Sequence, residues 1–154
     1  MGINHESAPV SVREQMAIPE IRLGDKCSLI TDKEGYFEAV IISTCNRIEI
    51  YTAADSDKFS QLDECFVFLY GADKMGSLSF YKFQGSEMMK HLCRVASGLD
   101  SMILGETEIL GQVKKSYAAA HLAGQTSRHL NKLFQNVFKI AKHVRTNSKI
   151  TRGA

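Results

Sequence analysis

The sequence predicts an α+β fold in which a small sheet with helices is followed by an antiparallel helical bundle. Strand-like runs occur only in the first part of the chain. The run 39–42 is apolar throughout, and Ile48–Thr52 alternates apolar with polar residues. From about residue 100 the strand signals stop, and apolar residues recur at helical spacing. A chain of 154 residues can form one domain, or two small subdomains that share a core.

Helical and strand-like stretches are mixed before residue 98. Apolar spacing predicts helices over Val10–Ile18 and Phe59–Tyr70, and Gly71 is placed to end the second of them. Leu78–Phe83 is predicted to form a further strand, and a helix is predicted to begin at Gly85. Two other glycines are predicted to mark loops, Gly24 and Gly35. We expect residues 1–98 to form an α+β subdomain of ferredoxin-like type.

The remaining part of the chain, residues 99–154, is predicted to form a helical subdomain. One amphipathic helix carries Ile109, Val113 and Tyr117 on a single face and ends at Gly124. A final helix presents a longer apolar face, made by Leu130, Leu133, Phe134, Val137, Phe138, Ala141 and Val144. Because such faces must be buried, the simplest arrangement is a small antiparallel bundle.

Composition places the chain among ordinary globular proteins. It is 44% hydrophobic and 23% charged. No apolar run approaches the roughly 20 residues that span a membrane, and the start of the chain shows no secretory pattern. The four cysteines form no Cys-x-x-Cys pair and have no zinc-site spacing. We therefore expect a cytoplasmic protein with reduced thiols, no bound metal and no membrane association.

Charge is distributed unevenly along the chain. Residues 128–154 contain seven Lys and Arg residues and no Asp or Glu, whereas the whole chain has a net charge of +2. The final helix therefore presents a basic face, which is the electrostatic footprint of a polyanion site. The alternative interpretation is a solvated helix face that carries lysines for solubility, and the sequence favours neither.

The segment Ser43–Arg47 connects the two best strand candidates, so Cys45 is predicted to lie at a strand end or in a turn. A thiol in that position can be exposed while rigid elements hold its backbone. The thiolate is the reactive form, and a nearby guanidinium favours it. Arg47 is therefore either that cation or a group that holds an anionic substrate. The alternative is a core cysteine packed in a β-turn, because free cysteines are usually buried.

A second cluster of polar residues follows Gly98. Two glycines bracket a short connection into a helix, and Glu108 and Gln112 share one face of that helix because they are four residues apart. Together with Ser101 and Glu106 they are predicted to crowd one polar pocket. The alternative is ordinary helix chemistry, in which acidic side chains near an N-terminus offset the helix dipole.

These clusters resemble the signatures of glutamyl-tRNA reductases. The resemblance lies in Ser-Thr-Cys-Asn-Arg at 43–47, in Ala-Ser-Gly-Leu-Asp-Ser-Met-Ile-Leu-Gly-Glu at 96–106 and in Ile-Leu-Gly-Gln-Val-Lys at 109–114. Gly2–His5 and Val12–Glu14 fit as well. The resemblance implies an N-terminal catalytic domain. Family members continue with an NADPH-binding and a dimerisation domain, which we expect to be absent here, so the full enzyme is expected to be a homodimer and this chain a monomer.

The resemblance also implies a reaction, the NADPH-dependent reduction of glutamyl-tRNA to glutamate-1-semialdehyde in tetrapyrrole synthesis. A cysteine thiolate attacks the activated ester, expels the tRNA hydroxyl and leaves a thioester. The chain shows no Gly-x-Gly-x-x-Gly fingerprint after a strand, so NADPH is expected to bind elsewhere. Alone, this chain is expected to form the thioester or hydrolyse the ester only. Glutamate-1-semialdehyde aminomutase is an expected partner of the full enzyme.

Site residues follow from the same resemblance. Cys45 is the implied nucleophile and His91 the implied acid–base residue. Arg47 suits the substrate's side-chain carboxylate, because a guanidinium binds it in a bidentate manner. Glu108 stands where the family usually has glutamine, so it accepts hydrogen bonds but does not donate them when ionised. The implied substrate-binding residues are Thr44, Asn46, Arg47, Ser101, Glu106, Thr107, Glu108 and Gln112.

Two other functions remain open at this point. The chain is alternatively a non-catalytic RNA-binding module that uses the basic final helix, with Cys45 chemically silent. A cysteine hydrolase or acyl transferase is a third possibility, but the sequence lacks the local signature of a Cys-His protease.

Overall fold

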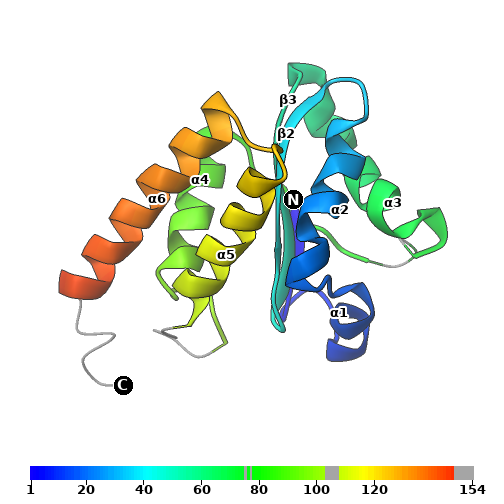
Figure 1. Cartoon of the computed structure of the whole chain (residues 1–154). Coiled ribbons are helices and arrows are strands. Elements are labelled where there is room, and N and C mark those ends of the chain that lie inside the picture. The colour runs from blue at the N-terminus through cyan, green and yellow to red at the C-terminus, as the bar shows by residue number, and fades with distance from the viewer. Residues whose placement is uncertain (75, 77, 103–107, 148–154) are drawn as a thin grey trace.

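A three-stranded antiparallel sheet lies at the centre of the described part of the molecule (Figure 1). The computed structural model describes residues 1–74, 76, 78–102 and 108–147. The strands are β1 (Gly2–Asn4), β2 (Tyr36–Ser43) and β3 (Arg47–Ala54), in the order β1-β3-β2. The two strands predicted around Cys45 are thus confirmed, and each extends several residues beyond its predicted run.

Helices cover both faces of the sheet. Figure 1 shows α2 (Leu23–Thr31) and α3 (Asp63–Tyr70) on one side, and α4 (Gly85–Ala96), α5 (Ile109–Leu122) and α6 (Arg128–Asn147) on the other. A short helix α1 (Val10–Met16) follows β1. Short 3-10 helices are η1 (Glu20–Arg22), η2 (Ser56–Gln61) and η3 (Ala72–Lys74). Because the sheet is covered on both sides, polar residues of β3 can be buried as deeply as its isoleucines.

Helix α2 was not predicted, because Gly24 was interpreted as a loop residue. The structure places Gly24 inside α2, and that prediction is wrong. A Cβ atom at this position would lie 2.7 Å from the Cβ of Ala123, so the glycine allows α2 to approach the end of α5 closely. Gly35 does lie in a loop, with a φ of +87° that side chains disfavour.

The strand predicted over Leu78–Phe83 does not form among its described residues. Only Tyr81 pairs, in an isolated antiparallel bridge to Gly2 with N···O distances of 3.0 and 3.1 Å. The segment still covers the outer edge of β1, which is how an exposed sheet edge is protected. The predicted fourth strand is therefore replaced by a single point of attachment.

The helices at the end of the chain form the predicted bundle and pack on the sheet as well. α4 contacts both α5 and α6, while α5 packs on β2 and α6 packs on β2 and β3. Four of the seven residues of the predicted apolar face of α6 are buried, namely Leu130, Phe134, Val137 and Ala141. These residues join those of the sheet in one hydrophobic cluster, so the two halves share a core. The α+β fold class is confirmed.

A buried carboxylate attaches α6 to the sheet. Glu38 of β2 is 2% exposed and accepts hydrogen bonds from the backbone N–H groups of Ser127, His129 and Leu130, at 2.5, 3.1 and 2.9 Å. These groups belong to the start of α6, where backbone donors have no partner within the helix. A negative charge there also complements the helix dipole. Glu38 therefore sets where α6 begins.

Candidate active site

Cys45 lies at the tip of the turn between β2 and β3. The backbone N–H of Thr44 donates to the carbonyl of Arg47 at 2.9 Å and closes the turn. The Thr44 hydroxyl oxygen accepts the N–H groups of Asn46 and Arg47, both at 3.2 Å. Threonine favours such turns because its side chain satisfies nearby backbone donors. The Cys45 side chain is exposed, so the alternative of a packed core cysteine does not apply.

Arg13 of α1 is hydrogen-bonded to the backbone of the same turn. Its Nη1 donates to the backbone carbonyl of Cys45 at 2.7 Å, and its Nε donates to the carbonyl of Ala8 at 3.1 Å. The Arg13 side chain is buried, as is that of Met16 on the same helix. This contact fixes the backbone of Cys45 and leaves the sulfur unengaged by it. Arg13 was not predicted as a site residue, although it belongs to one of the segments that carry the family resemblance.

A cavity of about 620 Å³ opens beside the Cys45 sulfur. α1 and the segment after it form one wall, the turn forms a second, and Met102 contributes from the chain after α4. The described residues that line it are Val10, Arg13, Glu14, Ala17, Ile18, Pro19, Ser43, Thr44, Cys45, Asn46 and Met102. Two predicted substrate-binding residues, Thr44 and Asn46, therefore lie in the same cavity as the predicted nucleophile.

Arg47 does not face this cavity. Its guanidinium is 1% exposed, and Nη1 donates to Glu49 at 3.1 Å and to the carboxylate of Asp100 at 3.0 Å. Nη2 donates to the backbone carbonyl of Asp100 at 2.6 Å. Burial opposes its charge, but the charge of Glu49 and the hydrogen bond to Asp100 outweigh burial and raise the pKa of Arg47. The guanidinium fork expected to hold a substrate is thus occupied by internal carboxylates. Arg47 and Glu49 are two residues apart on β3, so their side chains lie on one face of the sheet.

Glu49 is the centre of this buried cluster. One carboxylate oxygen accepts the Tyr51 hydroxyl at 2.6 Å. The other accepts Arg47 at 3.1 Å, the Tyr81 hydroxyl at 2.6 Å and Nε2 of His91 at 2.6 Å. Burial alone raises the pKa of Glu49, but the hydrogen bond and charge of His91 and the charge of Arg47 outweigh it, so the pKa is lowered. Glu49 is therefore ionised in the folded protein.

The two tyrosines of the cluster remain protonated donors. Burial, together with the charge of Glu49, raises the pKa of Tyr51 and of Tyr81 above the usual value for a phenol. Neither residue was predicted to belong to a site. For Glu49 and Tyr51 the available signal was the alternation of Ile48–Thr52, which places both side chains on the Arg47 face of β3.

His91 of α4 lines a second cavity, of about 720 Å³. Its side chain is 13% exposed, and its ring lies 4.9 Å from that of Phe83 and 5.2 Å from that of Tyr81, measured between ring centroids. Besides His91, the lining residues are Phe83, Ser86, Glu87, Met89, Lys90, Cys93, Arg94, Asp100 and Ile140. Cys45 is not among them. The predicted nucleophile and the predicted acid–base residue thus line separate cavities.

The segment after α4 contributes one lining residue to each of the two cavities. Asp100 lines the His91 cavity, Met102 lines the Cys45 cavity, and the half-buried Ser101 lies between them in the chain. Glu108 is exposed and immediately precedes α5, and Gln112 is half-buried in its first turn. Of the described residues, neither Glu108 nor Gln112 lines either cavity. Glu106 and Thr107 lie outside the described residues.

Comparison with known proteins identifies the family. The model described as "Glutamyl-tRNAGlu reductase, N-terminal domain" matches residues 1–148. The chain belongs to this family. Its similarity to the glutamyl-tRNA reductase of Akkermansia muciniphila is 46% identity over all of this chain and 46% of that protein. The glutamyl-tRNA reductase 2 of Koribacter versatilis is 41% identical over 97% of this chain and 34% of its own length.

A solved structure shows the same fold. Glutamyl-tRNA reductase from Methanopyrus kandleri superposes with a TM-score of 0.81 and 31% sequence identity, over 99% of this chain and 35% of that one. The chain thus spans less than half the length of the relatives named here. For this glutamyl-tRNA reductase domain, the resemblance detected in the sequence is confirmed.

The remaining cysteines of the reductase domain differ from Cys45 in their surroundings. Cys27 and Cys65 are buried, and burial raises the pKa of their thiols to about 12 and about 11. Cys93 is half-buried, and burial raises its pKa as well. Because a thiolate is required for nucleophilic attack, these environments disfavour reaction.

Two further searches bear on the site. The part of the chain that the structure describes contains no group of three or more His, Cys, Asp or Glu side chains arranged to hold a metal ion. Over the same residues, no helix has the length and apolar character needed to cross a membrane.

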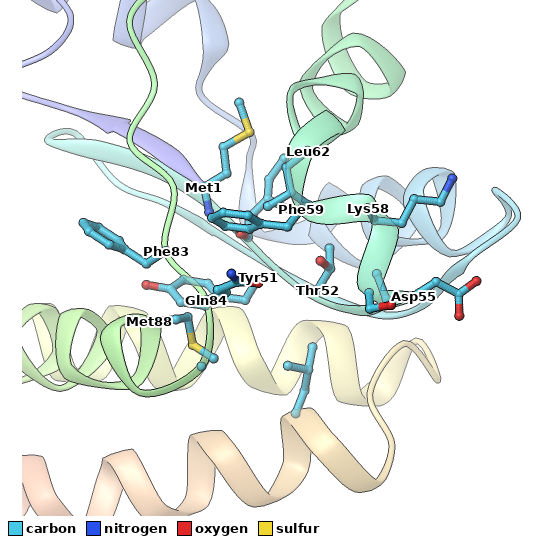
Figure 2. Close-up of a pocket in the computed structure, with 15 residues that line it drawn as sticks. Met1, Tyr51, Thr52, Asp55, Lys58, Phe59, Leu62, Phe83, Gln84 and Met88 are labelled. Atoms are coloured by element: carbon cyan, nitrogen blue, oxygen red, sulfur yellow. The ribbon is translucent and has the colours of Figure 1, made fainter.

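A third cavity, of about 170 Å³, lies beside β3 on the far side of the Glu49 cluster from the Cys45 turn. Figure 2 shows Met1, Tyr51, Phe59 and Met88 among its lining side chains; Met1 precedes β1, and the others come from β3, η2 and α4. It contains none of the residues predicted for the site.

Proposed function

We propose that this chain is the acyl-accepting part of a glutamyl-tRNA reductase, with Cys45 as its nucleophile. The observation that carries the proposal is the position of Cys45, whose exposed thiol sits on a rigid turn beside a cavity of about 620 Å³. The full reaction would be the NADPH-dependent reduction of glutamyl-tRNA to glutamate-1-semialdehyde, the first step of tetrapyrrole synthesis.

The step assigned to this chain is acyl transfer. The Cys45 thiolate attacks the carbonyl carbon of the glutamyl ester, a carbon–sulfur bond forms, and the bond from that carbon to the ribose oxygen breaks. The tRNA leaves with a free hydroxyl after taking up one proton. A preformed turn favours this step, because a nucleophile held in place loses little freedom on reaching the transition state.

The described residues show no dinucleotide site. β1 leads into α1 through a segment without glycine, β2 leads into a hairpin and β3 into a 3-10 helix. None of these three strands is therefore followed by the glycine-rich turn and helix that bind a pyrophosphate. NADPH would therefore be bound by a part of the enzyme that this chain does not span. We derive no hydride step from these residues.

The predicted substrate contacts remain predictions, with one revision. Thr44 and Asn46 lie beside the thiol, which supports them. Ser101, Glu106, Thr107, Glu108 and Gln112 are retained from the family resemblance. Arg47 is already paired with Asp100, so a substrate carboxylate would reach its guanidinium only after displacing that residue. The division into residues 1–98, with the nucleophile, and 99–154, which complete the pocket, is also kept.

The test is covalent labelling. The chain is incubated with glutamyl-tRNA that carries a radiolabelled glutamyl group, and protein-bound label is measured after acid quenching. We expect label on the wild type and on Cys93→Ser, and none on Cys45→Ser. Cys93→Ser is the matched control because Cys93 lines the other cavity. Equal labelling of Cys45→Ser and the wild type would exclude the proposed nucleophile, and slow release of free glutamate would report hydrolysis of the thioester.

A second candidate is a non-catalytic RNA-binding module. α6 supports it, because Arg128, Lys132, Lys139 and Lys142 are all exposed on this one helix. Retention of tRNA without any protein-bound label would favour this function. Salt-dependent binding alone would not decide, because both candidates contact phosphates.

The location, assembly and partner of the full enzyme are part of the same proposal. We expect the complete reductase to act in the cytoplasm as a homodimer and to deliver its product to glutamate-1-semialdehyde aminomutase. The 154-residue chain is expected to be a monomer, which sedimentation would test.

A further inference from the structure

The Glu49 carboxylate collects hydrogen bonds from three separate parts of the chain. Arg47 and Tyr51 are its neighbours on β3, Tyr81 belongs to the segment that crosses β1, and His91 comes from α4. An ionised carboxylate only accepts hydrogen bonds. The 2.6 Å contact with Nε2 of His91 therefore requires a proton on that nitrogen.

The ring of His91 is held in this orientation by its other neighbours. Tyr81 and Phe83 lie against it at centroid distances of 5.2 and 4.9 Å. Within the part of the chain that the structure describes, Nδ1 of His91 makes no hydrogen bond, while the ring lines the cavity of about 720 Å³. One nitrogen is thus committed to the protein interior, and the other is left for a ligand of the cavity.

We propose that Glu49 is a positioning residue, which fixes neutral His91 as the Nε2–H tautomer and so makes Nδ1 the nitrogen that exchanges a proton with substrate. A buried carboxylate performs this task for catalytic histidines in general, by orienting the ring and stabilising the imidazolium. The proton-transfer role rests on the function proposed above. The tautomer does not, because it follows from the Glu49 contact alone.

Proton transfer then has a defined route. The imidazolium form of His91 gives the proton on Nδ1 to the ribose oxygen as the bond from that oxygen to the glutamyl carbon breaks. His91 is left neutral with its proton on Nε2, which Glu49 continues to accept. The leaving oxygen is bonded to the carbon that the Cys45 sulfur attacks, so this route requires that carbon to lie between the Cys45 turn and the His91 ring.

Other charged and titratable groups surround the pair and shift its protonation together. They come from every element packed against Glu49 and His91 and comprise the Met1 ammonium, Arg47, Tyr51, Tyr81, Glu87, Lys90, Arg94 and Asp100. A titration curve alone would therefore not identify the role of Glu49. A direct observation of the tautomer is required.

The first measurement uses the wild-type chain labelled with ¹⁵N-histidine. Two-bond proton–nitrogen correlations distinguish the Nε2–H from the Nδ1–H tautomer, and a His91→Gln sample assigns the His91 signals among those of the five histidines. At a pH where His91 is neutral, we expect the Nε2–H pattern alone. A mixture of tautomers, or the Nδ1–H form, overturns the proposal whether or not any variant folds.

The second measurement compares Glu49→Gln with Glu38→Gln. Both replace a buried sheet carboxylate by its amide, but only Glu49 touches His91. We expect Glu49→Gln to produce a mixture of tautomers, since an amide can donate as well as accept. Glu38→Gln should keep the wild-type pattern. If both variants keep it, Glu49 does not set the tautomer and the proposal fails.

The labelling assay supplies the functional arm. Glu49→Gln should transfer the glutamyl group to Cys45 at least about 10-fold more slowly at saturating glutamyl-tRNA, since general acid–base residues contribute that much or more. A labelling rate unchanged in Glu49→Gln overturns the proton-transfer role. An unlabelled wild type instead refutes the proposed function and leaves the tautomer assignment to be judged by the spectra.

Discussion

Two buried glutamates of the same sheet have opposite kinds of partners. Glu38 on β2 is held by three backbone N–H groups at the start of α6. Glu49 on β3 is held by an arginine, a histidine and two tyrosines. The two are similarly buried, at 2% and 1% exposure. Burial and charge therefore do not separate a structural carboxylate from one placed for chemistry.

The chemistry of the donors does separate them. Backbone N–H groups do not titrate in the physiological range, and those at Glu38 belong to a helix end that is part of the core. The donors at Glu49 include His91, which can change protonation and lines a cavity. A carboxylate surrounded by titratable side chains next to a cavity is a candidate for function. A carboxylate surrounded by amides is a helix cap.

The largest difference is expected when each carboxylate is removed. Glu49→Leu leaves Arg47 buried with only Asp100 to balance it, and breaking a buried ion pair in this way costs about 3–5 kcal/mol. We expect a corresponding loss in the free energy of unfolding, measured by urea denaturation with circular dichroism. We expect Glu49→Leu to lose more free energy of unfolding than Glu38→Leu, and the opposite order would contradict this comparison.

Acid is expected to destabilise the wild type by protonating Glu49. The pKa of Glu49 is lowered from 4.5 in the folded protein, so its contribution to stability is complete above that value and is lost as the pH falls toward the folded pKa. The urea midpoint of the wild type should therefore decrease from neutral pH to about pH 3.

Glu49→Gln provides the comparison for this acid effect. Its midpoint should be lower at neutral pH and should change less over the same range, because the titrating group is gone. Parallel curves for the variant and the wild type would show that other carboxylates account for the acid sensitivity.

A smaller effect is expected at Glu38. In Glu38→Gln the side-chain oxygen still accepts one N–H, but the charge that complements the start of α6 is lost, which costs about 1–2 kcal/mol. Hydrogen exchange should show faster exchange at His129 and Leu130 than in the wild type. Glu87→Gln, on the exposed face of α4, is the control and should change neither measurement.

The smallest effect is expected from the two tyrosines. Tyr51→Phe and Tyr81→Phe each remove one hydroxyl donor from Glu49, which keeps its remaining partners, so each should cost about 1 kcal/mol. Tyr70→Phe is a matched control, because its hydroxyl donates to the carbonyl of Met16 instead. Only the first two variants should raise the pKa of Glu49, measured by carboxyl ¹³C chemical shifts. A similar shift in Tyr70→Phe would mean that the effect is not local.

Local patterns were sufficient for the turn that carries Cys45. Two strand-like runs flank it, and threonine and asparagine favour turns, so its position followed from a few neighbouring residues. The helices after residue 98 were equally accessible, because their apolar faces repeat at helical spacing. In both cases the information lies within one element of the chain.

The Glu49 cluster was not accessible in this way. Alternation along Ile48–Thr52 suggests that Glu49 faces solvent, and it is buried because His91 of α4 and Tyr81 of the segment beside β1 cover it. The partner of Arg47 is Asp100, 53 residues away in the sequence. α2 was missed for a related reason, since Gly24 is required by the approach of α5 rather than by a loop. The surroundings of these residues depend on contacts between elements that are distant in the sequence. The local periodicity of apolar residues does not predict such contacts.

The hydrogen bond from Arg13 to the turn has a consequence for the chemistry of position 45. The guanidinium binds the carbonyl oxygen of Cys45, an atom that every amino acid possesses. The scaffold therefore specifies a location in space without specifying which side chain occupies it. Serine, alanine or selenocysteine should be displayed there equally well, which makes this position suitable for comparing the intrinsic reactivity of nucleophiles on an unchanged framework.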